Sequence, residues 1–484
     1  MPHIDARAAD GSQTKLDRVA ADALATSMRG YLLIEDDPGY DEARRLWNGM
    51  IDRRPALIAR CIGVADVVAC VNFARDHGVL LSIRSGGHNI AGLALADGAL
   101  TIDTSLMRGV HVDAPARRAH AQAGCVLGDV DRETQLHGLA AVLGFVSNTG
   151  VAGLTVGGGF GYLTRRFGWT SDTVKSFEVV TADGRVVRTD ETNEPDLFWG
   201  LRGGGGNFGV VTNIEYELFP VGPEIMGGAV AWRAADAPAV LEMYRRLMAD
   251  APPEFTCVAA LRMAPPAPWL PKELHGTPIV ALFVCDTGPM DEARNRATAL
   301  KSFGTPVGDV LQPRPYLQQQ SLLDATQPNG RRYYWKSEFL PGVEPAFLET
   351  CLASLARMPS AHSAIMLFPL DGALNALSED HSAVGSRDTK GVVNISAAWD
   401  DPAHDDANIA WARETWDQIR PFSTGRTYVN FLNADDGAAR THDAYRGNYG
   451  RLADVKRAYD PGNVFRTNKN ITPSGADPAD RGEG

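Results

Sequence analysis

Cysteine is scarce in this sequence, and its spacing excludes the sites that cysteine usually builds. None of the cysteines forms a Cys-x-x-Cys pair or a ligand spacing with histidine, so we expect no metal site and no disulfide framework. Buried free thiols in a reducing cytoplasm are the expectation. The six positions are Cys61, Cys70, Cys125, Cys257, Cys285 and Cys351.

Long apolar runs and runs of basic residues are also missing. Residues 1–15 are polar and mixed, without the apolar segment of a secretory signal. No stretch reaches the ~18 apolar residues that a spanning helix needs. Lys and Arg total 47 against 59 Asp and Glu, a net charge of -12, whereas nucleic-acid binders concentrate positive charge. Neither a membrane nor a nucleic acid is therefore expected as a partner.

Glycine is plentiful, and its distribution divides the chain. At 484 residues the chain is too long for one ordinary core. Glycine residues are clustered before Pro220 and sparse after it. Near Tyr428 the composition of the first part of the chain returns. These shifts predict an α+β protein in which residues 1–219 and 428–484 form one domain and residues 220–427 a second. The tail from about residue 474, after Pro473, is expected to be disordered.

Hydrophobic periodicity predicts the elements of the first part. A strand, a helix ending at Gly78 and a second strand make one unit, and Asp183-Gly184 is the turn of a hairpin. The expected strands are Ala56–Cys61, Val79–Ile83, Leu100–Asp103, Arg117–Ala123 and Val210–Phe219, the hairpin is Phe177–Arg188, and the helices are Val64–His77 and Asp129–His137.

The rest of the chain alternates between amphipathic segments and strands. A short strand is expected near Tyr428, and a helical stretch over Asp435–Arg457. The other expected helices are Ala239–Ala249 and Glu344–Met358, and the other strands are Thr256–Met263, Ile279–Cys285, Ser363–Pro369 and Val392–Trp399.

Three glycine-rich loops beside strands indicate a phosphate-bearing cofactor, because glycine lets backbone amides approach a ligand closely. They are residues 84–89, 150–161 and 203–206. Six glycines among the twelve residues of the second loop are not expected inside a helix or strand. The alternative is a purely structural role, in which these glycines only form turns.

The segment Gly204-x-Gly206-x-x-Gly209 matches the dinucleotide fingerprint literally. That fingerprint requires a helix after it, whereas here an alternating strand, Val210–Phe219, follows. An NAD-dependent dehydrogenase, which would be colourless, is therefore a minor alternative.

The combination of motifs resembles the berberine-bridge-enzyme-like FAD oxidases of the vanillyl-alcohol-oxidase superfamily, which have a PCMH-type FAD-binding domain. The likeness covers about residues 40 to 473 with the motifs in the family's order. They are Arg84-Ser85-Gly86-Gly87-His88-Asn89, Gly150 to Gly161, Asp196-Leu197-Phe198-Trp199 leading to Arg202-Gly203-Gly204-Gly205-Gly206-Asn207, Tyr428-Val429-Asn430-Phe431, and Tyr459-Asp460-Pro461-x-Asn463.

The resemblance implies a two-part FAD domain with an inserted α+β substrate domain, an antiparallel sheet covered by helices. It implies that His88 is bonded to the 8α-methyl carbon of FAD, as a neutral imidazole can be near pH 7. Tyr428 and Asn430, on one face of a strand, would lie beside the isoalloxazine. The implied cofactor-binding residues are His88, Arg84, Ser85, Gly86, Gly87, Asn89, Val146, Gly150, Gly153, Gly158, Phe160, Asn207, Val210, Tyr428 and Asn430.

Two departures from the family pattern change what is expected. Many members hold the flavin by a second bond from a cysteine, but that position is Val146 here, so we expect a single histidyl link. The usual proton acceptors are also missing, with Phe431 in place of a tyrosine and Ala376 in place of a glutamate. A phenyl ring cannot accept a proton, so another group must do so, or the substrate must ionise by itself.

The candidates for catalysis are Tyr449, Tyr334 and Asp371. Glu338, Arg387 and Tyr445 are further possibilities, and the run Tyr333-Tyr334-Trp335 either lines a pocket or packs a sheet. The expected reaction is hydride transfer from a small or medium organic molecule to FAD, with molecular oxygen giving hydrogen peroxide. The alternatives are a dehydrogenase of the same fold and a flavin-holding protein that has lost catalysis.

Overall fold

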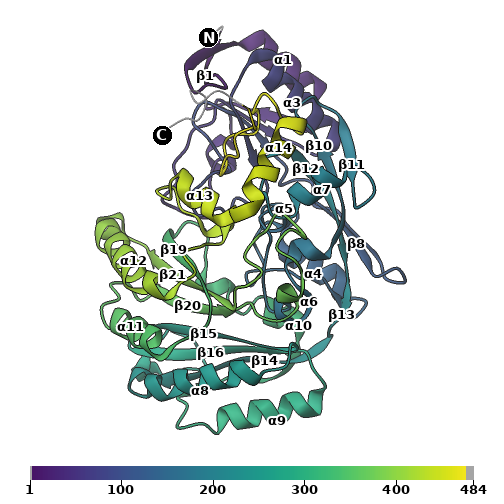
Figure 1. Cartoon of the computed structure of the whole chain (residues 1–484). Coiled ribbons are helices and arrows are strands. Elements are labelled where there is room, and N and C mark those ends of the chain that lie inside the picture. The colour runs from purple at the N-terminus through teal and green to yellow at the C-terminus, as the bar shows by residue number, and fades with distance from the viewer. Residues whose placement is uncertain (1–2, 476–484) are drawn as a thin grey trace.

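The computed structural model describes residues 3–475 and has an α+β fold in two parts. In Figure 1 the N-terminal segment and the yellow C-terminal segment lie together at the top, and the teal and green insert forms the bottom. The expected two-part architecture with an inserted segment is confirmed. No helix in residues 3–475 has the length and apolarity that crossing a membrane requires.

A four-stranded sheet with the order β3-β4-β6-β5 positions the first glycine-rich loop. Strands β4, β6 and β5 are parallel, as expected for a strand-helix-strand unit. Gly78 ends α3 in the left-handed conformation, with φ of 63°, which glycine adopts without strain. The elements are α1 (Arg18–Ser27), β3 (Tyr31–Leu33), α2 (Tyr40–Ala43), β4 (Leu57–Arg60), α3 (Val64–His77), β5 (Leu81–Arg84) and β6 (Leu100–Asp103), after a hairpin of β1 (His3–Arg7) and β2 (Gln13–Asp17).

A five-stranded antiparallel sheet, β11-β10-β12-β8-β7, forms the second half of this part. The predicted hairpin is β10 with β11, and the predicted strand Val210–Phe219 is β12 in its centre. The elements are β7 (Val110–Asp113), β8 (Arg118–Gln122), α4 (Leu127–Gln135), β9 (Leu139–Ala140), α5 (Val151–Val156), α6 (Thr164–Phe167), β10 (Val174–Val180), β11 (Val186–Thr189), α7 (Pro195–Leu201), β12 (Val210–Glu217) and β13 (Phe219–Pro220).

The expectation that residues 150–161 contain no helix is wrong. Residues Val151–Val156 form the helix α5, with Gly153 inside it. Val151, Ala152 and Val156 are buried in the same apolar cluster as the five-stranded sheet. Tertiary packing therefore offsets the low helix propensity of one glycine.

The insert is built on an eight-stranded antiparallel sheet, ordered β17-β14-β16-β15-β20-β21-β19, with β18 pairing β14. Helices α8, α11 and α12 pack on one face around a core that includes Trp232, Phe347 and Trp411. Strands β14 and β19 were not predicted. The strands are β14 (Glu224–Arg233), β15 (Phe255–Met263), β16 (Pro278–Asp286), β17 (Gly308–Asp309), β18 (Gln312–Pro315), β19 (Arg332–Leu340), β20 (Ala364–Pro369) and β21 (Gly391–Trp399), and the helices are α8 (Ala237–Asp250), α9 (Met290–Lys301), α10 (Tyr316–Gln320), α11 (Pro345–Leu355) and α12 (Asp405–Ile419).

The C-terminal segment returns to the first part through α13 (Ala438–Tyr445) and α14 (Tyr449–Tyr459). The prediction of a short strand near Tyr428 is wrong, because Val429–Phe431 form a single 3-10 turn that pairs with no strand. Ser474, in the predicted tail, donates its backbone N–H to the Ala453 carbonyl, so the chain is held as far as that residue. Residues 476–484 of that tail lie outside the described residues.

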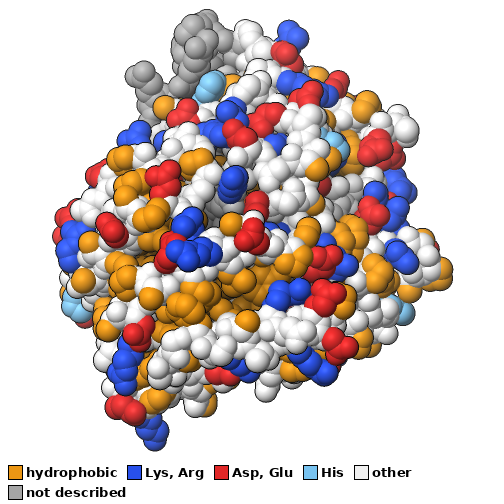
Figure 2. Space-filling model, turned by 60° about the horizontal axis from the view of Figure 1, so that its bottom comes forward, with side chains coloured by type: hydrophobic (Ala, Val, Ile, Leu, Met, Phe, Trp, Pro, Cys, Tyr) orange, Lys and Arg blue, Asp and Glu red, His pale blue; other side chains and the backbone are white. Residues whose placement is uncertain are grey.

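The surface is mixed in charge. Figure 2 shows acidic and basic side chains interspersed over one face, around a band of hydrophobic side chains across its middle. All six cysteines lie within the described range and are buried and free.

Candidate functional site

A cavity lies between the two parts of the chain. One wall is made by the loops after β5 and around α5, and the other by strands β15, β19, β20 and β21 of the insert. The C-terminal segment closes it with Tyr428–Phe431 and Thr467–Lys469. Segments far apart in sequence therefore meet at this one site, as ligand sites between domains commonly do.

Two glycine-rich loops touch backbone to backbone at the base of the cavity. A Cβ atom on Gly86 would lie 2.4 Å from the backbone nitrogen of Gly150, so no larger residue fits there without movement. Gly153 and Gly206 also line the cavity, but a Cβ atom on either would meet no protein atom within 4 Å. Their backbones are thus open to a ligand on the cavity side, which fits the close approach of a cofactor.

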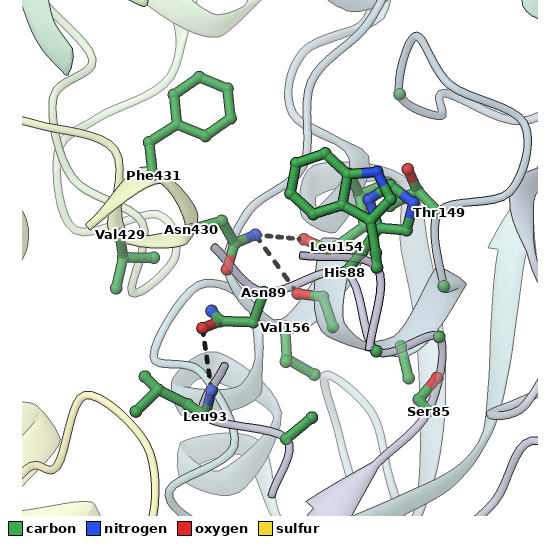
Figure 3. A pocket seen from close by; sticks show the side chains of 18 of the residues that line it. Ser85, His88, Asn89, Leu93, Thr149, Leu154, Val156, Val429, Asn430 and Phe431 are labelled. Carbon is green, nitrogen blue, oxygen red and sulfur yellow. Dashed lines mark hydrogen bonds between the residues drawn. The ribbon is translucent and has the colours of Figure 1, made fainter. Parts of the chain in front are cut away.

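His88 is part of this wall, and Figure 3 labels it among the residues that line the cavity. Its ring is half-buried and stacks on Trp47, with 4.7 Å between centroids and 18° between planes. The Nε2 atom lies 2.9 Å from Oδ1 of Asn148. Burial lowers the His88 pKa to about 4, although the Asn148 contact opposes the shift. The imidazole is neutral at pH 7, and if Nε2 donates to Asn148, the lone pair is on Nδ1.

Tyr428 and Asn430 still meet although they are not on a strand. The Asn430 side-chain amide donates to the Tyr428 hydroxyl at 2.8 Å and to the Leu154 carbonyl at 3.2 Å, the second contact being visible in Figure 3. The Tyr428 hydroxyl accepts the Gly159 N–H at 2.8 Å. Together they fasten the C-terminal segment to the loop around α5.

Most of the residues implied by the resemblance are brought together. Three are not. The Arg84 guanidinium turns away to the Ala43 carbonyl and to Asp103, 3.6 Å away. Gly158 lies behind the wall against Val384. Val210 faces the core, whereas its neighbour in β12, Val211, lines the cavity. The residues that do line it are Ser85, Gly86, Gly87, His88, Asn89, Val146, Gly150, Gly153, Phe160, Asn207, Tyr428 and Asn430.

The three residues named for catalysis lie outside the cavity lining. The Tyr334 hydroxyl donates to Asp435 at 2.6 Å, and burial raises the Tyr334 pKa. Asp371 forms an ion pair with Arg165 at 2.8 Å. Tyr449 packs against His442, with ring centroids 4.7 Å apart. The structure does not bring any of these side chains to His88.

Of the further possibilities, only Tyr445 lines the cavity. Glu338 is fully buried and paired with Arg440 at 2.7 Å, and Arg387 is paired with Asp172 at 2.6 Å. Each of these ion pairs joins the insert to the other part of the chain, because Arg440 lies on α13 and Asp172 lies in the N-terminal part. Trp335, in the aromatic run, does line the cavity.

Apart from Trp335, the wall supplied by the insert was not predicted from the sequence. Its side chains alternate along the strands, as period two requires. Among the described residues, no Asp or Glu lines the cavity, whereas Phe431 does. The members of this wall are Arg262 on β15, Trp335 on β19, Ala364, Met366 and Phe368 on β20, and Asn394 and Ser396 on β21, with His362 just before β20.

Comparison with known proteins identifies both parts of the FAD half. The family model described as an FAD binding domain matches residues 55–190, and the one described as berberine and berberine like matches residues 427–472. The chain is 31% identical to (R)-6-hydroxynicotine oxidase of Paenarthrobacter nicotinovorans, covering 94% of this chain and 99% of that protein. It is 30% identical to aclacinomycin-N/aclacinomycin-A oxidase of Streptomyces galilaeus, covering 94% and 92%.

The fold agrees with these matches. The crystal structure of 6-hydroxy-D-nicotine oxidase from Arthrobacter nicotinovorans superposes with a TM-score of 0.82 at 28% identity, covering 93% of this chain and 99% of that one. Motifs, fold and full-length similarity agree. The chain therefore belongs to the berberine-bridge-enzyme-like FAD-linked oxidases of the vanillyl-alcohol-oxidase superfamily, and it is an FAD-dependent oxidoreductase.

Proposed function

We propose that the chain oxidises a small or medium organic molecule, such as an alcohol, a phenol or a polyketide-like metabolite, with FAD bound covalently through His88 alone. When bound, FAD would supply the two-electron chemistry, with the substrate's hydride accepted on the flavin and the electrons given to molecular oxygen to form hydrogen peroxide. One observation carries the proposal. The neutral imidazole of His88 lies in the wall of a cavity that is lined in large part by glycine backbone.

His88 is suited to form the bond. Its low pKa keeps a lone pair available, and Trp47 and Asn148 hold the ring from its face and from its edge. Val146 lines the same cavity but has no nucleophilic atom, so a second link cannot form there. The backbone of residues 85–89 and of Gly153, Gly206 and Asn207 would hold the remainder of the cofactor.

No carboxylate among residues 3–475 can take the substrate's proton in this wall, and the imidazole of His362, which does line it, is a weakened base because burial lowers its pKa. Burial raises the pKa of Tyr428, whose hydroxyl already accepts two hydrogen bonds, and Phe431 has no acceptor atom. These facts support a substrate that gives up its proton readily, as a phenol does, rather than one that needs a strong base.

Two observations distinguish this function from its alternatives. Anaerobic addition of alcohols and phenols should bleach the flavin, and a protein that has lost catalysis would stay yellow with all of them. Admission of air to the reduced protein should restore the colour rapidly with formation of hydrogen peroxide. Slow reoxidation would instead identify a dehydrogenase.

A further inference from the structure

One row of side chains crosses the insert sheet on the side of the cavity. Arg262 of β15 is opposite Ala364 of β20, Ala364 is opposite Ser396 of β21, and Ser396 is opposite Trp335 of β19. All four line the cavity. The small Ala364 leaves space over the sheet between the longer side chains of Arg262 and Trp335.

Arg262 is a buried cation without an anion. Only 7% of the residue is exposed, and among residues 3–475 no carboxylate forms an ion pair with it, the one charged neighbour that shifts its pKa being Arg331. Its Nε donates a long hydrogen bond of 3.3 Å to the Met263 carbonyl, and its terminal nitrogens donate to no described residue. Burial, helped by the charge of Arg331, lowers the Arg262 pKa to about 10, so the group stays charged at pH 7. Burying a charge without a partner is costly unless a ligand supplies one.

The groups around Arg262 leave this end of the cavity positive. Asp400 is occupied by Arg331 at 2.8 Å and by His362 at 3.0 Å. Burial and the nearby arginines lower the His362 pKa, so this ring does not add a second unpaired cation at neutral pH. One positive charge, on Arg262, therefore has no counterpart.

The remainder of the cavity beside this cation is aromatic. Trp335 packs edge to face on Phe431, with centroids 5.3 Å apart, and Phe431 packs on Phe160 at 5.7 Å. The Trp335 Nε1–H is buried and has no hydrogen-bond partner among the described residues. An aromatic ring fits such walls, and an oxyanion fits the unused donors.

We propose that Arg262 binds the carboxylate of an aromatic substrate and so determines which molecules this cavity accepts. The inference rests on the proposed function, because it assigns a substrate class to the same cavity. The two terminal N–H groups of the guanidinium can hold the two oxygens of one carboxylate, a geometry that lysine cannot reproduce.

Paired ligands test this assignment on the FAD-loaded protein. Calorimetry with benzoate against benzamide, phenylacetate against phenylacetamide, and cinnamate against cinnamamide compares the same ring with and without charge. We expect at least one carboxylate to bind about 10- to 100-fold more tightly than its amide. That preference should vanish in Arg262→Gln and be reduced in Arg262→Lys.

Arg332→Gln is the matched control. Arg332 lies on β19 but pairs with Asp405 outside the cavity lining, so the preference should persist in this variant. The inference is overturned if no carboxylate is preferred by the wild type, or if Arg262→Gln keeps the preference while holding FAD and melting like the wild type. If instead Arg262→Gln does not fold, Arg262→Lys decides, because an undiminished preference there excludes the paired geometry. FAD content and flavin bleaching are recorded separately, so that loss of the proposed function is distinguished from loss of this site.

Discussion

Asp131 is a buried carboxyl group whose effect on stability can be predicted with its sign. It lies on α4 with 1% exposure, and no cation pairs with it among the described residues. Gln320 donates to its Oδ2 at 3.1 Å, and its Oδ1 has no partner. Burial raises the Asp131 pKa from 3.8 to about 7, with the Gln320 contact opposing the shift.

The raised pKa makes the folded protein less stable as the pH rises. Between about pH 4 and pH 7 the folded state keeps this proton and the unfolded chain has lost it, so the free energy of unfolding falls with increasing pH. One unit is worth about 1.4 kcal/mol, so the loss attributable to Asp131 between pH 5 and pH 8 is at most roughly 3 kcal/mol.

Asp131→Asn removes the titration and keeps an oxygen that can accept from Gln320. We expect the variant to gain stability relative to the wild type by about 2–3 kcal/mol on going from pH 5 to pH 8. Urea unfolding followed by tryptophan fluorescence at both pH values measures this difference. Glu133→Gln, on the same helix but only half-buried, is the charge-matched control and should show no such gain. A difference between Asp131→Asn and the wild type that does not change with pH would refute the reasoning.

Two further substitutions test the support of the cofactor site. Lys456 is fully buried, and its Nζ donates to Asp460 at 2.6 Å, to the Asn207 carbonyl at 2.7 Å and to the Phe465 carbonyl at 2.9 Å. Lys456→Met should lower the free energy of unfolding by ~3–5 kcal/mol, because it leaves the Asp460 charge buried without a partner. An unchanged midpoint in urea unfolding would contradict this. Asn148→Leu removes the contact that orients His88. The rate of covalent flavin attachment should fall by roughly tenfold, which corresponds to the free energy of about one hydrogen bond. An unchanged rate of acid-resistant flavin formation would show that Asn148 does not position the ring.

Local elements could be predicted from the sequence where the hydrophobic periodicity agreed with residues that end helices or form turns. Gly78 ends α3, and Asp183-Gly184 turns the hairpin of β10 and β11. Strand β14 was missed because eight of its ten residues are buried on both faces and two are glycines, so it shows neither alternation nor a strand-like composition. The helix α5 was excluded on propensity, although packing decides the conformation of so short a segment.

The cofactor side of the site could be predicted because it is made of continuous motifs. Residues 85–89 follow one strand directly and keep their order in space. The substrate side could not, since Arg262, Ser396 and Trp335 come together only through the order of strands in the insert sheet. Period two places neighbouring residues on opposite faces, so Trp335 lines the cavity and Tyr334 faces the helices. The sequence does not indicate which face is which.

The central claim is that His88 alone carries the flavin, and one measurement tests it directly. The purified protein is denatured in acid and digested, and the peptides are separated and their masses are measured by mass spectrometry. The account predicts that FAD mass stays on the peptide containing His88 and on no other, and that the His88→Ala protein releases all of its flavin into the acid supernatant. Free flavin from the wild type, or flavin on a different peptide, would contradict it.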